Sequence, residues 1–175
     1  DTYQNLYVKG KVKLCNYGLE RSKFHNKLFL HVRLFYAYGE GQRKNSLINQ
    51  LYSSGRDSKI IKLTPCEHFR DYIFIDDVVV GIEKLISFNK SEVVNLGSGK
   101  AIVLKKFIEI FWKRMKADTK LLGFGKINLP EKQQFQPKAF ADLSKLYDLT
   151  KWKPSISIND GIKKTIMRLS HLNII

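Results

Sequence analysis

Apolar residues in this chain fall into short runs and helical repeats that alternate from one end to the other. The clearest run is the nearly continuous apolar stretch at residues 28–35, which is stopped by Tyr38-Gly39-Glu40-Gly41. A run this short and this apolar is typical of a central parallel strand that is buried on both faces. Shorter strand-like runs are expected at residues 60–63, 70–75, 92–96 and 120–123.

Between these runs, apolar side chains recur every three or four residues, which predicts amphipathic helices. Asp76 or Asp77 is expected to cap one of them, and Ser157 with Asp160 forms a capping box for the last. Strands and helices that alternate in this way predict an α/β fold with a mostly parallel sheet. The helices are expected at residues 3–24, 44–53, 76–86 and 104–115, from about residue 142, and from about residue 157 onward.

Length and composition indicate a folded chain with one hydrophobic core. Of its 175 residues, 43% are hydrophobic and 12% aromatic, enough apolar surface to offset the entropy lost on folding. A formal charge of +15 favours an anionic partner such as nucleic acid, acidic lipid or a phosphorylated substrate. In the predicted helix at 104–115 the lysines lie opposite the apolar face, so much of this charge is expected to be a solvated surface.

Several kinds of protein are disfavoured by features that the sequence does not have. Cys15 and Cys66 are too few for a disulfide framework and neither has zinc-finger spacing, and the four histidines are scattered. We therefore expect no metal and a reducing, cytoplasmic location. No apolar run approaches the roughly 20 residues of a membrane span, and no leader of the signal type is visible, so no membrane partner is expected.

Tyr7 and Lys11 are a candidate pair for acid–base chemistry. Their spacing of four places both side chains on one face of the first predicted helix. A neighbouring ammonium stabilises a phenolate, which lowers the tyrosine pKa from about 10 toward neutrality and suits the group to general acid and base catalysis. Such a pair is also expected about once or twice by chance in a chain this rich in lysine, so the surrounding sequence has to decide.

Five segments of the chain line up in order with one known family. They resemble the extended short-chain dehydrogenase/reductases, and in particular the second half of a nucleotide-sugar epimerase, dehydratase or reductase. The resemblance implies the C-terminal part of a Rossmann-like, doubly wound parallel sheet with a small substrate-binding α/β region. The segments are Tyr-Val-Lys-Gly-Lys at 7–11, Val-Arg-Leu-Phe-Tyr-Ala-Tyr-Gly-Glu-Gly-Gln at 32–42, Arg-Asp-Tyr-Ile-Phe-Ile-Asp-Asp-Val at 70–78, Val-Asn-Leu-Gly-Ser-Gly at 94–99, and Ala-Asp-Leu-Ser-Lys at 141–145 followed by Trp-Lys-Pro at 152–154.

The resemblance implies catalytic roles for two of these residues. Tyr7 would exchange a proton with a sugar hydroxyl or ketone while hydride moves to or from NAD or NADP. Lys11 would lower the Tyr7 pKa and hydrogen-bond the nicotinamide ribose. Tyr36 lies where relatives contact the cofactor and the substrate phosphates. Many of those relatives have Asn at this place, so a backbone contribution is the better expectation for Tyr36.

The resemblance also implies where a nucleoside-diphosphate sugar would bind. Arg70 would hold its diphosphate, a task that suits a planar cation with several donors. The alternative for Arg70 is a surface ion pair with Asp71 or Asp76. Lys132 lies roughly where some relatives keep a second phosphate-binding arginine, and a solvated lysine is the alternative there.

The glycine-rich βαβ unit through which such relatives bind NAD(P) has no counterpart in the sequence. Gly97-Ser98-Gly99 is followed by Ile102 instead of a third glycine, so we interpret it as a turn. We therefore expect a fragment of a larger enzyme or a truncated product, with the catalytic helix and strand in about residues 1–42 and a mainly substrate-binding region in 43–175. Faces meant for the absent strands should be exposed and sticky, and the complete protein is expected to be a homodimer.

Two functions from other classes stay open at this point. One is a non-catalytic remnant or interaction subunit that keeps the fold. The other is a basic nucleic-acid-binding module, which is disfavoured because the lysines are spread over every predicted helix and no nucleic-acid-binding motif accompanies them. The residues do not distinguish epimerase from dehydratase or reductase, and they do not identify the sugar or the base.

Overall fold

The computed structural model describes residues 6–128 and 138–172, in which helices and strands alternate as expected for an α/β fold. The predicted strands at 28–35, 60–63, 70–75, 92–96 and 120–123 and the predicted helices are present, and their ends among the described residues coincide with the prediction or differ by up to three residues. In chain order the elements are α1 (Leu6–Phe24), β1 (Leu30–Leu34), β2 (Tyr36–Tyr38), α2 (Leu47–Arg56), β3 (Ile61–Lys62), β4 (Phe69–Phe74), α3 (Ile75–Ile86), β5 (Glu92–Leu96), β6 (Ala101–Val103), α4 (Leu104–Arg114), the 3₁₀ turn η1 (Thr119–Leu121), β7 (Leu122–Gly123), α5 (Ser144–Thr150) and α6 (Ile158–Leu172).

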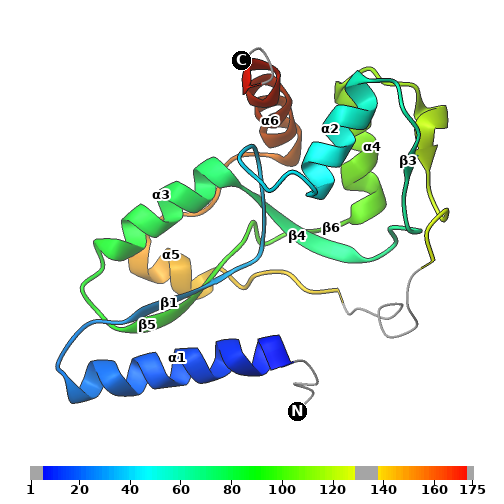
Figure 1. The fold of residues 1–175 in the computed structure, drawn as a ribbon. Helices are drawn as coiled ribbons and strands as arrows, with labels where there is room; N and C mark the ends of the chain where they lie inside the picture. The colour runs from blue at the N-terminus through cyan, green and yellow to red at the C-terminus, as the bar shows by residue number, and fades with distance from the viewer. Residues whose placement is uncertain (1–5, 129–137, 173–175) are drawn as a thin grey trace.

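The strands pair mostly in parallel, as the sequence predicts. β1 runs parallel to β5 in register from Leu30 opposite Glu92 to Leu34 opposite Leu96, while β2 pairs with β4 and β3 with β7, also in parallel. β6 is antiparallel to β4. The β1–β5 pair lies between α1 on one side and α3 with α5 on the other (Figure 1). Helices on both faces of a parallel sheet are the doubly wound arrangement.

Two clusters of buried side chains hold these elements together. The larger joins α2, α4 and α6 around Trp112, Phe107 and Phe111, all with no exposed surface. The smaller joins α3, β5 and α5 around Leu85, Leu96 and other aliphatic residues. Both clusters draw on segments from the middle and the end of the chain, so packing between distant segments stabilises the fold.

Expectations about helix starts were met in one case and wrong in another. The capping box is present at α6, where Ser157 Oγ accepts from Asp160 N at 3.1 Å. Neither Asp76 nor Asp77 caps α3: its N-cap is Phe74, without a side-chain hydrogen bond. Both aspartates lie in the first turn of α3, where the helix dipole stabilises a negative charge. Their carboxylate oxygens accept hydrogen bonds from residues far along the chain instead of from the start of the helix.

The Gly97-Ser98-Gly99 segment is the turn between β5 and β6, as interpreted from the sequence. The fully buried Asp71 carboxylate holds it, accepting from Ser98 N at 2.7 Å, Ser98 Oγ at 2.6 Å and Gly99 N at 3.0 Å. Ala141 N donates to the same carboxylate at 2.9 Å. A side chain at Gly97 would collide with Asp71 and Ala141, and Gly99 has φ of +76°. Asp71 is therefore a structural group that ties three segments together.

Helix α1 leaves most of its surface open. Of its residues, Cys15 and Ser22 are buried, while Leu6, Tyr17 and Phe24 are 85%, 60% and 78% exposed. The expectation that β1 is a central strand buried on both faces is wrong for the described residues: there it pairs with β5 alone, none of its residues is fully buried, and Leu34 is exposed. An apolar surface of this extent favours association with another surface. Within residues 6–128 and 138–172, no helix is both long and apolar enough to cross a membrane.

Candidate active site

Tyr7 and Lys11 lie together on the first half of α1. The Lys11 ammonium is 5.5 Å from the centre of the Tyr7 ring, as the four-residue spacing predicts. Both residues line a cavity of about 290 Å³ between α1 and β1, and His31 and Arg33 of β1 form its opposite wall. The Tyr7 side chain is 69% exposed. The two side chains therefore face the strand, at an opening wide enough for a ligand.

The second half of α1 sets this position. The Phe29 ring packs directly on Gly18, in space that any larger side chain would occupy. Ser22 is buried beside it and accepts a hydrogen bond from Ser91 Oγ at 3.5 Å, while its carbonyl accepts from Lys27 N at 2.8 Å. Anchored at this end, α1 runs back along β1 (Figure 1), and Tyr7 near its start lines the same cavity as Arg33 of the strand.

Tyr36 and Arg70 are also brought together, from neighbouring strands. β2 and β4 pair in parallel with Tyr36 opposite Tyr72, and the Arg70 guanidinium lies 4.7 Å from the centre of the Tyr36 ring. Arg70 Nη1 donates to the Phe69 carbonyl at 2.8 Å. Cations over aromatic faces are attracted by the ring quadrupole. The half-exposed Tyr36 ring thus restricts the orientation of the guanidinium.

Arg33 connects the two pairs. It lines the Tyr7–Lys11 cavity and also a second cavity of about 300 Å³ formed with Leu34, Phe35 and Tyr36. Both cavities open where β1 ends. In parallel α/β sheets, ligands bind outside the carboxyl ends of the strands. Tyr7, Lys11, Arg33, Tyr36 and Arg70 are therefore the described residues that we define as the candidate active site.

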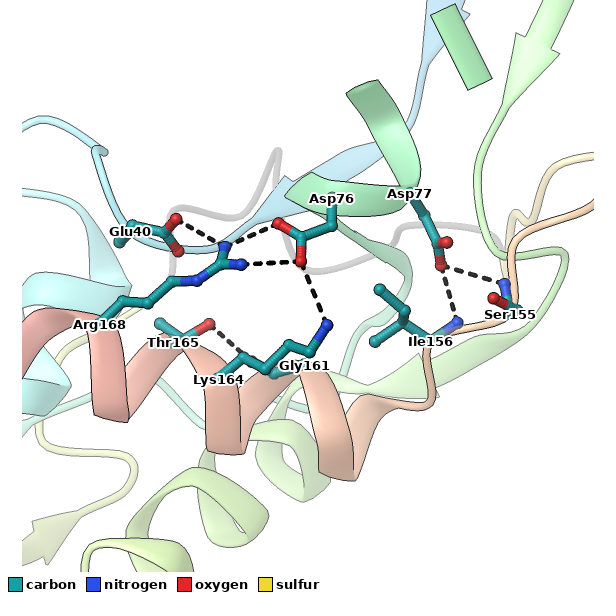
Figure 2. A network of polar contacts seen from close by, with 9 residues as sticks. All are labelled: Glu40, Asp76, Asp77, Ser155, Ile156, Gly161, Lys164, Thr165 and Arg168. Carbon is teal, nitrogen blue, oxygen red and sulfur yellow. Dashed lines mark hydrogen bonds and ion pairs between the residues drawn. The ribbon is translucent and has the colours of Figure 1, made fainter. Parts of the chain in front are cut away.

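The two carboxylates considered as partners for Arg70 have other, well-defined roles. Asp71 is buried in the turn described above. Asp76 receives both guanidinium nitrogens of Arg168, at 2.7 and 2.9 Å, and Lys164 Nζ at 3.3 Å (Figure 2). The hydrogen bonds from Arg168 are the main cause that holds the Asp76 pKa below its usual value, and Lys164 adds to the effect.

A charged network around Asp76 was not foreseen from the sequence. Arg168 also donates to Glu40 Oε1 at 2.8 Å, so α6 is joined to the loop after β2 as well as to α3 (Figure 2). Asp77 completes the connection by accepting from Ser155 N at 3.1 Å and Ile156 N at 2.9 Å. No local pattern predicts a pair 128 residues apart. The network fixes the loop that follows Tyr36.

Lys132, the remaining candidate from the sequence, lies outside the described residues. His68, for which the sequence predicts no role, lies two residues before Arg70, and its pKa is lowered, first by burial and then by the charge of Arg70. In the part of the chain that the structure describes, no three His, Cys, Asp or Glu side chains gather as a metal site would require.

The curated proteins with similar sequences include enzymes whose names refer to nucleotide sugars. No protein-family profile matches the chain. The CDP-abequose synthase of Salmonella muenchen is 30% identical over 168 residues, which are 91% of this chain and 56% of that protein. The UDP-glucuronate 4-epimerase of Thermodesulfobacterium geofontis is 32% identical over 139 residues, 77% of this chain and 41% of that protein. The chain spans about half the length of these relatives.

Solved structures show the same fold. The dTDP-glucose 4,6-dehydratase of Bacillus anthracis, solved in complex with NAD, superposes with a TM-score of 0.82 at 16% identity, covering 95% of this chain and 52% of that one. The fold is thus the α/β fold of the Rossmann-like epimerases and dehydratases, as predicted. The sequence is thus similar to those of nucleotide-sugar epimerases and dehydratases of the extended short-chain dehydrogenase/reductase family, and the fold is the one that the solved dehydratase has.

Proposed function

We propose that this chain forms the catalytic and substrate-binding part of an NAD- or NADP-dependent nucleotide-sugar epimerase, dehydratase or reductase. The observation that carries the proposal is the position of Arg33 between two cavities, one with Tyr7 and Lys11 and the other with Tyr36, whose ring lies over Arg70. A reaction on a nucleoside-diphosphate sugar requires an acid–base pair next to the sugar and a cation next to the phosphates, at adjoining positions. The names of the relatives support the substrate class.

In this proposal, Tyr7 moves the proton of the reaction. Its phenol gives a proton to a sugar ketone, or in the reverse direction its phenolate takes one from a sugar hydroxyl, at the carbon that exchanges hydride. Lys11, one helical turn away, places its ammonium 5.5 Å from the centre of the Tyr7 ring, so its positive charge lies next to the group that exchanges the proton. Because the Tyr7 side chain is largely exposed here, the reaction needs a further surface or a bound ligand to exclude water from it.

The cavity between α1 and β1 suits the nicotinamide end of the cofactor. Tyr7 and Lys11 offer a hydroxyl and an ammonium to a ribose, and the volume of about 290 Å³ accepts a single ring with its sugar. A nicotinamide supplies hydride transfer when it is bound. The sequence carries no G-x-G-x-x-G turn, so these residues would hold only this end of the dinucleotide.

Arg70 and Tyr36 would bind the diphosphate of the substrate. The Arg70 guanidinium lies against the Tyr36 ring and donates to the Phe69 carbonyl, and a planar cation with several N–H groups suits phosphate oxygens. We also propose Lys132 as a second cation for the same phosphates.

The exposed surface of α1 fits the expectation of a homodimer in the complete protein, since a helix of this kind needs a covering partner.

The test combines the chain with the part of the Salmonella muenchen CDP-abequose synthase that this chain does not match, supplied as a separate polypeptide. The mixture is given NAD or NADPH and CDP-, UDP- or dTDP-linked sugars, and products are followed by chromatography and by absorbance of the reduced nicotinamide. We expect turnover only when both polypeptides are present. Tyr7→Phe should reduce the rate at least about a hundredfold, because it removes the group that transfers the proton.

Tyr17→Phe is the matched control, because Tyr17 is exposed on the same helix at 60% and lines neither cavity. It should leave the rate unchanged. If no combination turns over any of the sugars although the two polypeptides associate, the non-catalytic interaction subunit becomes the better assignment.

A further inference from the structure

A basic groove lies along α4, away from the candidate active site. The face of α4 that was expected to be simply solvated forms one wall of a cavity of about 620 Å³, and β7 with the residues after it forms the other. A second cavity of about 430 Å³ continues from it toward α6. The two share Lys106, Ile110, Lys113 and Lys116, so they form one continuous groove. Within the described part of the chain, it has no lining residue in common with the two active-site cavities.

The groove concentrates positive charge. Lys106 and Lys113 are seven residues apart and therefore lie on one face of α4, and Lys116 follows just after the helix. Among the described residues that line it, Glu109 carries the sole negative charge, against four lysines and Arg114. Lys106 approaches Glu109 at 3.9 Å, with its side chain 64% exposed. Among the described lining residues, no acidic side chain other than Glu109 compensates the positive charge of the groove.

The groove also has an apolar floor. Phe124 lies between β7 and the loop after it, partly buried, with the Lys105 ammonium 5.1 Å from the centre of its ring. Ile110 and Leu122 lie beside it. An apolar floor with an aromatic ring, bordered by ammonium groups, matches a ligand that has a flat ring at one end and several negative charges at the other.

We propose that this groove binds a nucleoside polyphosphate, with the base on Phe124 and the phosphates on Lys106, Lys113 and Lys116. The volume lies within the range of pockets for small ligands. Lysine ammonium groups suit phosphates because they act as point charges on flexible stems. This site is independent of the proposed reaction: it has its own cations and its own apolar surface.

Lysine footprinting on the intact chain locates the ligand. An amine-acetylating reagent is applied with and without ATP, in the Arg70→Ala variant so that the active-site cation does not contribute, and labelling is measured by mass spectrometry. Lys106, Lys113 and Lys116 should be labelled at least about threefold less with ATP, while the exposed Lys84 and Lys90, which line neither cavity of the groove, stay unchanged. Equal protection of both sets would overturn the proposal, because it would mean general attraction to a basic protein.

Affinity measurements test the two ends of the ligand separately. Lys106→Glu with Lys113→Glu should weaken ATP binding at least about tenfold, whereas Lys84→Glu with Lys90→Glu, which changes the net charge equally, should have little effect. ATP should bind about fivefold or more tightly than tripolyphosphate, and Phe124→Leu, which keeps the packing, should remove that difference. No preference for ATP, or a single-stranded oligonucleotide that binds far more tightly than ATP, would refute the site as proposed.

Discussion

The contact between Tyr36 and Arg70 gives the most specific prediction about the candidate active site. If the Tyr36 ring orients the guanidinium for a diphosphate, then losing the ring should weaken the binding of a nucleoside diphosphate only while Arg70 is present. Tyr36→Phe keeps the ring, and Tyr36→Leu keeps an apolar side chain without it. The ring is half-exposed on an edge segment, so either change should leave the fold intact.

The size of the effect follows from the geometry. A cation at 4.7 Å from the ring centre at a partly exposed site is worth about 0.5–1 kcal/mol, which is a two- to fivefold change in affinity. Removing the guanidinium should cost more, about 1.5–3 kcal/mol, because charge-assisted hydrogen bonds to the phosphates are lost. Tyr36→Leu should therefore weaken binding two- to fivefold, Tyr36→Phe should not, and Arg70→Ala should weaken it at least tenfold.

Isothermal titration of CDP and UDP into the four proteins, together with the Tyr36→Leu/Arg70→Ala double variant, measures the coupling. The double variant should bind no more weakly than Arg70→Ala alone. If the two losses add, Tyr36 acts on the ligand directly and the positioning argument is wrong. If the unaltered chain binds neither nucleotide, the fault lies instead with the proposed function.

Three further predictions concern groups that hold the site in place. Asp71→Asn should lower the free energy of unfolding by about 2–3 kcal/mol in urea titrations, because it weakens a buried acceptor of four hydrogen bonds. Arg168→Met should cost about 1–2 kcal/mol at pH 7. The same variant should lose less of its free energy of unfolding as the pH is lowered. In the folded protein the Asp76 pKa lies below its usual 3.8, so the stability that Asp76 contributes is present above that pH and is lost as the pH falls through the folded value. Gly18→Leu should displace the Phe29 ring and raise amide hydrogen exchange throughout α1, and unchanged exchange would contradict the anchoring role given to that contact.

The elements that the sequence predicted well are those whose own residues specify them. The apolar run of β1 and the three- and four-residue repeats of α4 are local signals, and the Ser157 cap of α6 involves neighbours in the chain. The Tyr7–Lys11 pair is likewise local, since helix geometry alone brings positions four apart together. These features could be found because no distant segment is needed to form them.

The features that the sequence did not predict all depend on distant contacts. β2 is only three residues long and becomes a strand through pairing with β4. The two aspartates expected as caps were assigned by position alone, but Arg168, almost one hundred residues away, provides Asp76 with a stronger partner than a helix end would. The groove along α4 was hidden for the same reason, because its second wall is formed by β7.

The position of Tyr7 depends on contacts at the opposite end of its own helix. The buried Cys15, and Gly18 and Ser22 where α1 packs on Phe29 and Ser91, lie 8, 11 and 15 residues from Tyr7, so the helix projects about 12 Å beyond its packed part. A tilt of about 5° there would move the phenol by roughly 1 Å, a displacement that can cost about a hundredfold in rate. The first half of α1 therefore needs a second support to serve as a catalytic platform. Its exposed side chains, from Leu6 to Tyr17, are the surface on which such a support would act.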